Sequence, residues 1–375
     1  MIIRKSLILI LLTIISCGYI RAEDTDSTHS EEFNISETLF HHILDSHDWH
    51  LVDIPTGETD AHGDPVYKPV ALHLPWLFYS SKTGLEFYAN THAMHEAGKY
   101  VSHHEHVYAV AEGQSVPHEY HGHGELENSE EIIDESVTIY DLSPSKTVVQ
   151  IFLIGLLLVW LLSSVAKSYA KREGQAPKGM QSLMEPIILF VRDDIAKEYL
   201  GEKAEKFAPY LLSLFFFIWF SNMFGLMPFN SNIMGNISVT AALAFLSFIL
   251  IQVNGSKDYW RHTFAMPGVP IAIVPLMTII EVLSLFIKPI ALAIRLFANI
   301  TAGHFMVLSL VCLIFLMGES GKNLGGAFGI MPVSIVFTLA ILTLEVIVAI
   351  IQAYIFTLLT AVFIGMARET HDDHH

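Results

Sequence analysis

Residues 284–299 read SLFIKPIALAIRLFAN and lie within an apolar tract that runs from Met266 to Met317. At 1.5 Å per residue, this tract would be roughly 78 Å long as one helix. The hydrocarbon core of a bilayer is about 30 Å thick, so the tract either crosses it twice or lies strongly tilted. A second apolar tract, from Pro332 to Met366, is also too long for an upright span. Tilting is the natural explanation for its length.

Arg295 is the most informative residue of the first tract. An ionised residue at mid-membrane costs about 2.5–3.5 kcal/mol on insertion scales, so it is a functional candidate by default. A guanidinium is not deprotonated in a protein, and Arg295 is therefore a fixed positive charge. It can attract a carboxylate, displace the proton of that carboxylate and repel other cations, but it cannot itself carry a proton.

Polar residues of the two tracts share helix faces. At 100° per residue, several polar residues of the first tract fall within about 60° of one another, as expected for a helix that lines an aqueous path. They are Glu281, Ser284, Lys288, Arg295 and Asn299. Glu345 and Gln352, seven positions apart, share a face of the second tract. His304 falls on roughly the opposite side of its helix from Arg295, so a bend near Gly303 or a neighbouring helix is needed to bring it into the path.

Simpler roles are open to several of these residues. Lys288 can extend its ammonium group towards the lipid headgroups, and Ser284 can bond its own backbone. Glu281 can remain protonated and inactive. Arg295 can pair with Glu345 in a purely structural salt bridge. The sequence alone leaves these alternatives open.

The composition of the whole chain is typical of a membrane protein. Of its 375 residues, 52% are hydrophobic and 16% are charged, whereas soluble domains carry about 25% charged residues. Further apolar segments occur at 148–166, 207–227 and 237–253. Basic residues after the first of these mark its cytoplasmic end, and the mixed pattern of 180–206 is typical of a helix on the membrane interface. We predict an all-α membrane domain over 147–368 and a cytoplasmic tail over 369–375.

Residues 1–22 are predicted to be a secretory signal peptide, because a basic start precedes a short apolar core and small residues. Cys17 is either the lipidated residue of a lipoprotein processing site or is discarded after ordinary cleavage near Gly18 or Ala22. Either route places the residues that follow outside the cytoplasm of a bacterium. Cys17 and Cys312 are the two cysteines of the chain, so no disulfide framework is available.

Residues 23–146 form an acidic, histidine-rich segment that we expect to be extracytoplasmic. It has 24 Asp and Glu residues against 4 Lys and Arg, which argues against nucleic acid as a partner. Its 15 histidines, of 20 in the chain, either bind zinc or copper or buffer protons in a hydrated module. No pair has the spacing of a known metal motif, so we favour the second role and predict no metal and no cofactor. Alternating apolar residues predict short strands at 70–79 and 85–88, joined by a turn at 80–84.

The segment 284–299, the following Ala302-Gly303 and residues 344–357 resemble the signature of subunit a, the stator channel subunit of F-type ATP synthases. The resemblance covers roughly residues 145–368. It implies one upright span, an interfacial helix and two long tilted helical hairpins beside a rotating ring of c subunits. It also implies peripheral-stalk b subunits, the rest of the ATP synthase complex and the lipid bilayer as partners, in the inner membrane of a bacterial cell.

The same resemblance implies roles for individual residues. Arg295 would face the carboxylates of the c ring and separate two half-channels. Asn299 and Gln352 match polar residues of the outer half-channel, and Glu281 and Ser284 match positions nearer the cytoplasmic exit.

Two ionisable residues depart from the family pattern. Many members have Glu after the Ala-Gly pair and His seven positions before the Gln, whereas this chain has His304 and Glu345 in these places. A proton relay needs one carboxylate and one imidazole within reach, whichever helix supplies each. We therefore expect function to survive the exchange and His304 and Glu345 to lie close together.

These observations predict a stator subunit that conducts protons to and from the c ring and couples their flow to rotation and ATP synthesis. It would not be an enzyme by itself, since the sequence has no G-x-x-x-x-G-K-[ST] motif for a nucleotide. Sodium coupling stays open, because the ion-binding carboxylate would belong to another chain. Two other classes are a secondary cation transporter, which would normally show internal repeats, and a metal-sensing receptor built around the histidine-rich segment.

Overall fold

The computed structural model describes residues 48–59, 65–103, 106–111, 113–114, 132–134, 136–172, 174–227, 232–264, 270, 273–318 and 323–368. The predicted signal peptide and C-terminal tail lie outside these residues, as do the histidine clusters at 41–42 and 118–123. The chain forms two compact units, one made chiefly of residues 40–152 and one made chiefly of residues 153–375.

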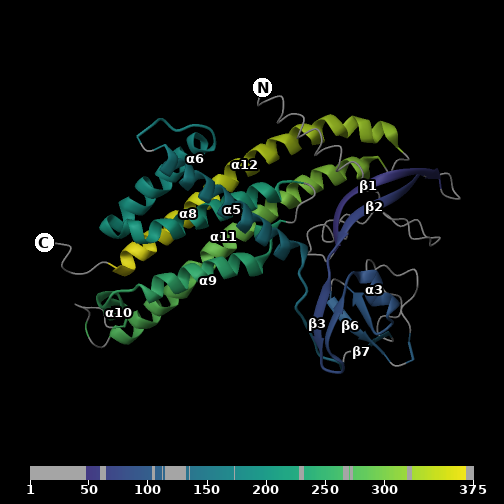
Figure 1. Ribbon diagram of the computed structural model, residues 1–375, viewed down its shortest axis with the longest axis horizontal. Helices are drawn as coiled ribbons and strands as arrows, with labels where there is room; N and C mark the ends of the chain where they lie inside the picture. Colours follow the sequence, from purple (N-terminus) through teal and green to yellow (C-terminus); the bar gives the residue numbers. More distant parts are fainter. Residues whose placement is uncertain are drawn as a thin grey trace. The chain divides into compact units, whose positions relative to one another are not determined.

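Small antiparallel sheets build the first unit (Figure 1). One is the pair β1-β2, the second has the strand order β4-β3-β8 and the third has the order β5-β6-β7. The strands are β1 (Asp48–Thr59), β2 (Pro65–His73), β3 (Trp76–Ser80), β4 (Gly84–Tyr88), β5 (Tyr100–His103), β6 (His106–Val110), β7 (Ile133–Asp134) and β8 (Ile139–Asp141). A short helix, α3 (Thr91–Glu96), follows β4.

The predicted hairpin is present, but the predicted first strand is wrong in one respect. Strands β3 and β4 pair from Trp76 with Tyr88 to Ser80 with Gly84, and Gly84 adopts a φ of 86°, which favours glycine. The run 70–79 is not one strand, because β2 ends at His73 and β3 begins at Trp76. Pro75 lies in this break, where it has no backbone N–H to donate to a ladder.

Alternate residues of β3 form the core of this unit. Trp76 and Phe78 are fully buried and pack with Met94 of α3 and with Tyr100 of β5. The Trp76 indole N–H donates to Thr91 Oγ1 at 3.1 Å, which fixes α3 against the inner face of the sheet. The remaining core residues are Val107, Ala109 and Val137.

An ion pair joins the second and third sheets at their edge. Lys82, in the turn between β3 and β4, donates to Asp134 Oδ2 at 2.8 Å. This hydrogen bond, together with those from Ser136, lowers the pKa of Asp134 to about 2. The pairing therefore persists at any ordinary pH and is lost only as the pH falls through that value.

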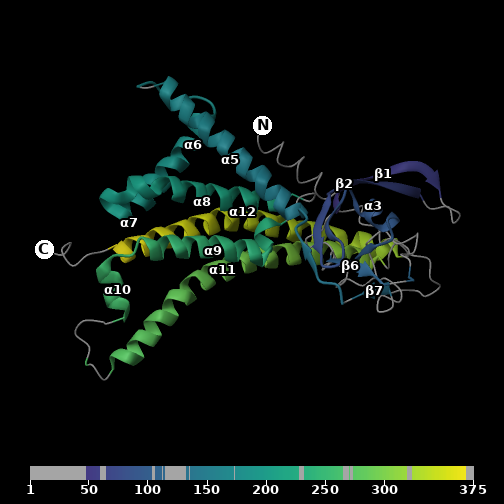
Figure 2. The same cartoon turned by 60° about the horizontal axis from the view of Figure 1, so that its bottom comes forward.

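The second unit is helical (Figures 1 and 2). Its helices are α5 (Lys146–Lys171, which begins in the first unit), α6 (Met180–Leu189), the π-helix η1 (Phe190–Lys197), α7 (Glu198–Leu200), the 3-10 turn η2 (Gly201–Lys203), α8 (Ala204–Gly225), the 3-10 turn η3 (Ile233–Gly235), α9 (Ile237–Val253), α10 (Lys257–Phe264), α11 (Val274–Met317) and α12 (Leu324–Arg368). The expected interfacial helix at 180–206 is thus not one regular helix. It passes through π-helical and 3-10 turns into α8.

Four helical runs of the described residues are long and apolar enough to cross a membrane, or five if the bent pair α9–α10 counts as one span. The chain is therefore a multi-pass membrane protein. Helix α11 is continuous over 44 residues, and α12 over 45. At 1.5 Å per residue each is roughly 66 Å long, so of the two alternatives for the first tract the chain adopts a single long helix, which fits a bilayer only when inclined.

Helices α8, α9, α11 and α12 pack side by side (Figure 2). α11 lies against α12 and α9, and α12 also lies against α8. Helix α11 ends at Met317 and α12 begins at Leu324, and so short a link is typical of antiparallel neighbours. Buried positions of α11 such as Leu292, Leu296 and Ile300 face this bundle, which leaves the other side of the helix outward.

We expect Phe78→Ala to destabilise the β-sheet unit by about 3–5 kcal/mol, because a fully buried aromatic ring is removed from its core. Protease digestion of the full chain in membranes should then cut the unit much faster than in the parent protein. Tyr79→Ala is the matched control, since the adjacent side chain is 48% exposed and should leave digestion nearly unchanged. Equal sensitivity of the two variants would contradict this description of the core.

Candidate functional site

Arg295 lies on the outward side of α11. The buried residues Leu292 and Leu296 flank it in sequence, whereas Arg295 itself and Asn299, one turn later, are exposed. Among the described residues, no carboxylate forms an ion pair with Arg295. The purely structural salt bridge between Arg295 and Glu345 is therefore not formed, and the cation faces away from the protein interior.

Glu345 is buried at the contact between α11 and α12. Its side chain is 4% exposed, and it lies against Gly303 so closely that a Cβ on Gly303 would sit 2.7 Å from the Glu345 Cδ and 2.9 Å from its Cγ. Glycine at 303 thus makes room for the carboxyl group. No described residue bonds the Glu345 Oε1 atom, and a buried polar atom of this kind calls for a functional explanation.

His304 follows Gly303 directly and is half-buried on α11. Of the two ways to bring His304 into the path, the structure provides a neighbouring helix, because α12 meets α11 at Gly303. Glu345 and the residue before His304 therefore meet at one level of the α11–α12 contact. Closeness of the two ionisable side chains themselves stays a prediction.

Gln352 continues the buried polar face of α12, where it is 5% exposed. A residue of α8 reaches the same face: the Asn222 side-chain amide donates to the Ala349 carbonyl oxygen at 3.4 Å. Asn222 and its neighbour Ser221 are fully buried, and no described residue bonds Asn222 Oδ1 or Ser221 Oγ. The sequence analysis did not select Asn222 as a site residue, although an amide side chain inside the apolar α8 was a usable signal.

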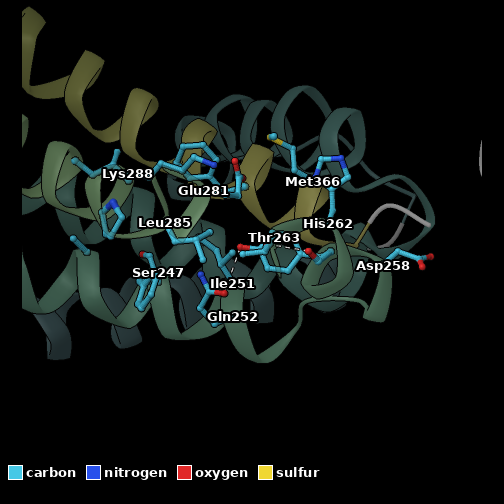
Figure 3. A pocket seen from close by; sticks show the side chains of 16 residues that line it. Ser247, Ile251, Gln252, Asp258, His262, Thr263, Glu281, Leu285, Lys288 and Met366 are labelled. Atoms are coloured by element: carbon cyan, nitrogen blue, oxygen red, sulfur yellow. Dashed lines mark hydrogen bonds between the residues drawn. The ribbon is translucent and has the colours of Figure 1, made fainter. Parts of the chain in front are cut away.

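A second polar region lies towards the other end of the bundle, where α9, α10, α11 and α12 surround a cavity of about 330 Å³ (Figure 3). Glu281 and Lys288 of α11 line it, and Ser284, between them in sequence, is not among its lining residues. The cavity has room for roughly ten water molecules at about 30 Å³ each. It is therefore large enough to hold a hydrated path.

Helix α10 supplies polar groups to this cavity that the sequence did not predict. The α9–α10 pair is bent by 104°, and this bend places Tyr259 and His262 in the cavity wall (Figure 3). The Tyr259 hydroxyl donates to Gln252 Oε1 at 3.4 Å. The Lys288 Nζ lies 5.2 Å from the centre of the Phe363 ring, and its extension towards the lipid headgroups stays an open alternative.

The polar groups of α11 thus flank Arg295 in both directions along the helix. Glu281 lies roughly 21 Å before Arg295 along the helix axis and Gly303 lies roughly 12 Å after it, at 1.5 Å per residue. Within the described part of the chain, no group of three or more metal-ligating side chains occurs. Long apolar helices, an exposed arginine within one of them and a buried carboxyl group between two of them are typical of a multi-pass membrane protein of the ion-transport class.

Comparison with known proteins identifies the family. A family model described as ATP synthase A chain matches residues 148–365. An ATP synthase subunit a from Anaeromyxobacter dehalogenans is 37% identical over 343 residues, which cover 86% of this chain and 83% of that protein. Another, from Chloroherpeton thalassium, is 42% identical over 240 residues, covering 63% of this chain and 69% of the relative. The chain belongs to the ATP synthase subunit a family, and the resemblance found in the sequence is confirmed.

The β-sheet unit matches a separate family model. Residues 38–142 match a domain of unknown function, DUF8433. This match covers most of the acidic segment and ends just before α5, so the chain joins this domain to the membrane part through a very short connection.

We expect Gly303→Ala to lower ATP-driven proton pumping by about tenfold or more, because the new methyl group displaces the Glu345 carboxyl and small misplacements of this kind are costly. The measurement is acidification of inverted membrane vesicles on addition of ATP. Gly329→Ala is the control, since a Cβ at that helical glycine meets nothing within 4 Å. Pumping by Gly303→Ala at the level of Gly329→Ala would show that the close contact is unimportant.

Proposed function

We propose that this chain forms two proton half-channels against a ring of c subunits and couples proton flow to rotation of the ring and to ATP synthesis. The observation that carries the proposal is the exposed position of Arg295 on a long, mostly apolar helix. An ion at bilayer depth is costly unless it finds a counter-charge. Because no described carboxylate of this chain pairs with Arg295, the counter-charge comes from another subunit.

The surface around Arg295 fits a close helical partner. Ala291, Ala298 and Ala302 are exposed on the same side of α11, and small side chains let the backbone of a neighbouring helix approach closely. A c-ring helix that carries a carboxylate can therefore bring its acid to the guanidinium. The Arg295 charge displaces the proton of that acid and repels other cations, so it prevents a direct leak between the half-channels.

One half-channel contains the buried polar groups after Arg295 on α11 and α12. Protons enter through Gln352, Glu345, His304 and Asn299 and neutralise a carboxylate of the ring. The neutral site then turns into the lipid, where an ionised carboxylate would meet a large desolvation penalty. Because of this penalty, a site that still carries charge is held at Arg295 and enters the lipid only after it has been protonated.

The other half-channel is the cavity that contains Glu281. After nearly a full turn the ring carboxylate reaches the far side of Arg295 and releases its proton towards Ser284, Glu281 and the cytoplasm. The membrane potential adds about 2.3 kcal/mol per charge for each 100 mV. In this arrangement the β-sheet unit is extracytoplasmic, the C-terminus is cytoplasmic, and peripheral-stalk b subunits hold the chain against rotation in the bacterial inner membrane. The chain binds no nucleotide itself.

We expect Arg295→Ala to abolish ATP-driven proton pumping in membrane vesicles, because the ring carboxylate loses the fixed charge that displaces its proton. ATP hydrolysis by the soluble catalytic part, measured after its release from the membrane, should be unchanged. Ile294→Ala is the matched control, since Ile294 is also exposed on this face but carries no charge. Coupled pumping that persists in Arg295→Ala vesicles would refute the proposal.

Exchanging the two ionisable residues tests the relay. The double variant His304→Glu with Glu345→His should retain more pumping than either His304→Ala or Glu345→Ala, because it keeps one imidazole and one carboxyl at the α11–α12 contact. The three variants are compared by initial rates of vesicle acidification at equal amounts of assembled complex. If the exchanged chain loses as much activity as the single alanine variants, the two groups do not share a relay.

A further inference from the structure

The β-sheet unit carries an exposed apolar surface that its core does not use. It lies on the outer face of the sheet β4-β3-β8, where facing residues of the three strands are apolar. Its exposed members are Tyr79 (48%), Leu85 (68%), Phe87 (65%), Tyr140 (64%) and Leu142 (63%). We call this set the outer sheet face. Monomeric soluble domains seldom expose a contiguous apolar surface of this kind without a partner.

Strand register makes the surface continuous. Tyr79 of β3 is paired with Leu85 of β4 on one side and with Tyr140 of β8 on the other. Phe87 is paired with Leu77, and the Leu142 backbone N–H donates to the Leu77 carbonyl oxygen at 2.9 Å. Since neighbouring strands lie about 4.8 Å apart, the face is about 10 Å across from β4 to β8.

The other face of the same sheet is already covered. Trp76 and Phe78 point to that side and pack with Met94 of α3, so α3 and the outer sheet face lie on opposite sides of the sheet. Charged residues of the strands also avoid the outer face. Glu86 alternates with Leu85 and Phe87 and accepts a hydrogen bond from the Tyr88 hydroxyl at 3.4 Å, and Asp141 alternates with Tyr140 and Leu142.

The position of the first membrane helix, α5, indicates which surface covers the outer sheet face. The Leu77 backbone N–H donates to Ser143 Oγ at 2.9 Å, and α5 begins at Lys146, so only Pro144 and Ser145 separate the sheet from the span. The first turns of α5, up to Phe152, belong to the same compact unit as the sheet. Leu142 is thus within roughly 14 Å of the start of α5, at up to about 3.5 Å per residue.

The headgroup region of a bilayer is about 5–8 Å thick on each side, so a residue no more than roughly 14 Å from the start of α5 can reach it. Tyrosine is enriched at this depth in membrane proteins, because its ring is apolar and its hydroxyl is polar. The segment 23–146 carries 24 acidic and 4 basic residues, so a second copy of this acidic surface would be repelled. An uncharged lipid surface would not be repelled by this acidic segment.

We propose that the outer sheet face docks onto the bilayer surface that α5 enters, through apolar contact with phospholipid. Tyr79, Phe87 and Tyr140 insert their rings at the level of the headgroups, and Leu85 and Leu142 lie against the acyl chains. The acidic charge of the segment contributes nothing to this docking, which is therefore insensitive to salt. Membrane anchoring by α5 is sufficient for the docking, so it does not depend on the proposed proton path.

The test uses the assembled complex in nanodiscs of the lipids phosphatidylethanolamine and phosphatidylcholine, which carry no net charge, with the photoreactive residue p-benzoylphenylalanine in place of Phe87 or Glu96. Glu96 is exposed on α3, on the opposite side of the sheet, and provides the matched control. On illumination, the probe at position 87 is expected to form phospholipid adducts, detected by mass spectrometry, at 150 mM and at 1 M salt alike. The probe at position 96 is expected to form none.

Other results would overturn the proposal. A cross-link from position 87 to another subunit or to a second copy of this chain means that protein covers the face. No phospholipid adduct at position 87, or equal adducts at both positions, means that the face is not specifically docked. As a second variant, Tyr79→Ser with Leu85→Ser should abolish the phospholipid adduct of a probe at Tyr140 while the unit stays resistant to protease. Retention of the adduct in this variant would equally contradict apolar docking.

Discussion

A fixed positive charge on an apolar helix constrains the whole membrane part of this chain. Arg295 cannot lose its charge, and the described residues offer it no carboxylate. The positions of α11 that are buried, such as Leu292 and Leu296, turn the guanidinium away from the bundle. The fold therefore holds the charge outward, away from the carboxylates of the described residues. If Arg295 were instead buried in an ion pair with Glu345, its charge would be neutralised within the chain and could not attract the carboxylate of another subunit.

The length of α11 follows from the same constraint. An upright span of about 20 residues is slightly too short to hold both Glu281 and Gly303, which are 22 positions apart. The 44-residue helix places these positions roughly 33 Å apart in total along its axis. On an inclined helix of this length, Arg295 lies between the polar region at Glu281 and the polar region at Gly303. The neighbouring α12, of similar length, contributes Glu345 to one region and Phe363 to the other.

Much of this arrangement was predictable from local pattern. The apolar tracts predicted the long helices, for the first tract as one of two alternatives, and the turn at 80–84 predicted the β3–β4 hairpin. These features depend on periodicity within one segment, which the sequence contains. The family resemblance was equally local, since it rested on short runs around Arg295 and Gln352.

For contacts between distant segments, the sequence predicted only that His304 and Glu345 lie close together, and the others were not predictable. Glu345 lies against Gly303, 42 positions earlier in the chain, and only the packing of α11 on α12 creates that contact. Tyr259 and His262 reach the cavity because α10 bends by 104° from α9, and the sequence of this short helix carries no sign of that angle. The amide of Asn222 finds its carbonyl partner on α12 for the same reason.

In the β-sheet unit, the local sequence pattern indicates more burial than the structure shows. In a sheet with one solvated face, strands alternate apolar and polar residues. Strand β3 reads Trp76-Leu77-Phe78-Tyr79 and is apolar on both sides, which in an isolated sequence indicates a strand buried between two layers. The structure covers one side with α3 and leaves the other open. Strand β3 has the composition of an interior strand, but protein covers only one of its sides, so the other side needs a second apolar medium. The lipid bilayer is such a medium, and α5, which starts three residues after Ser143, brings it within reach.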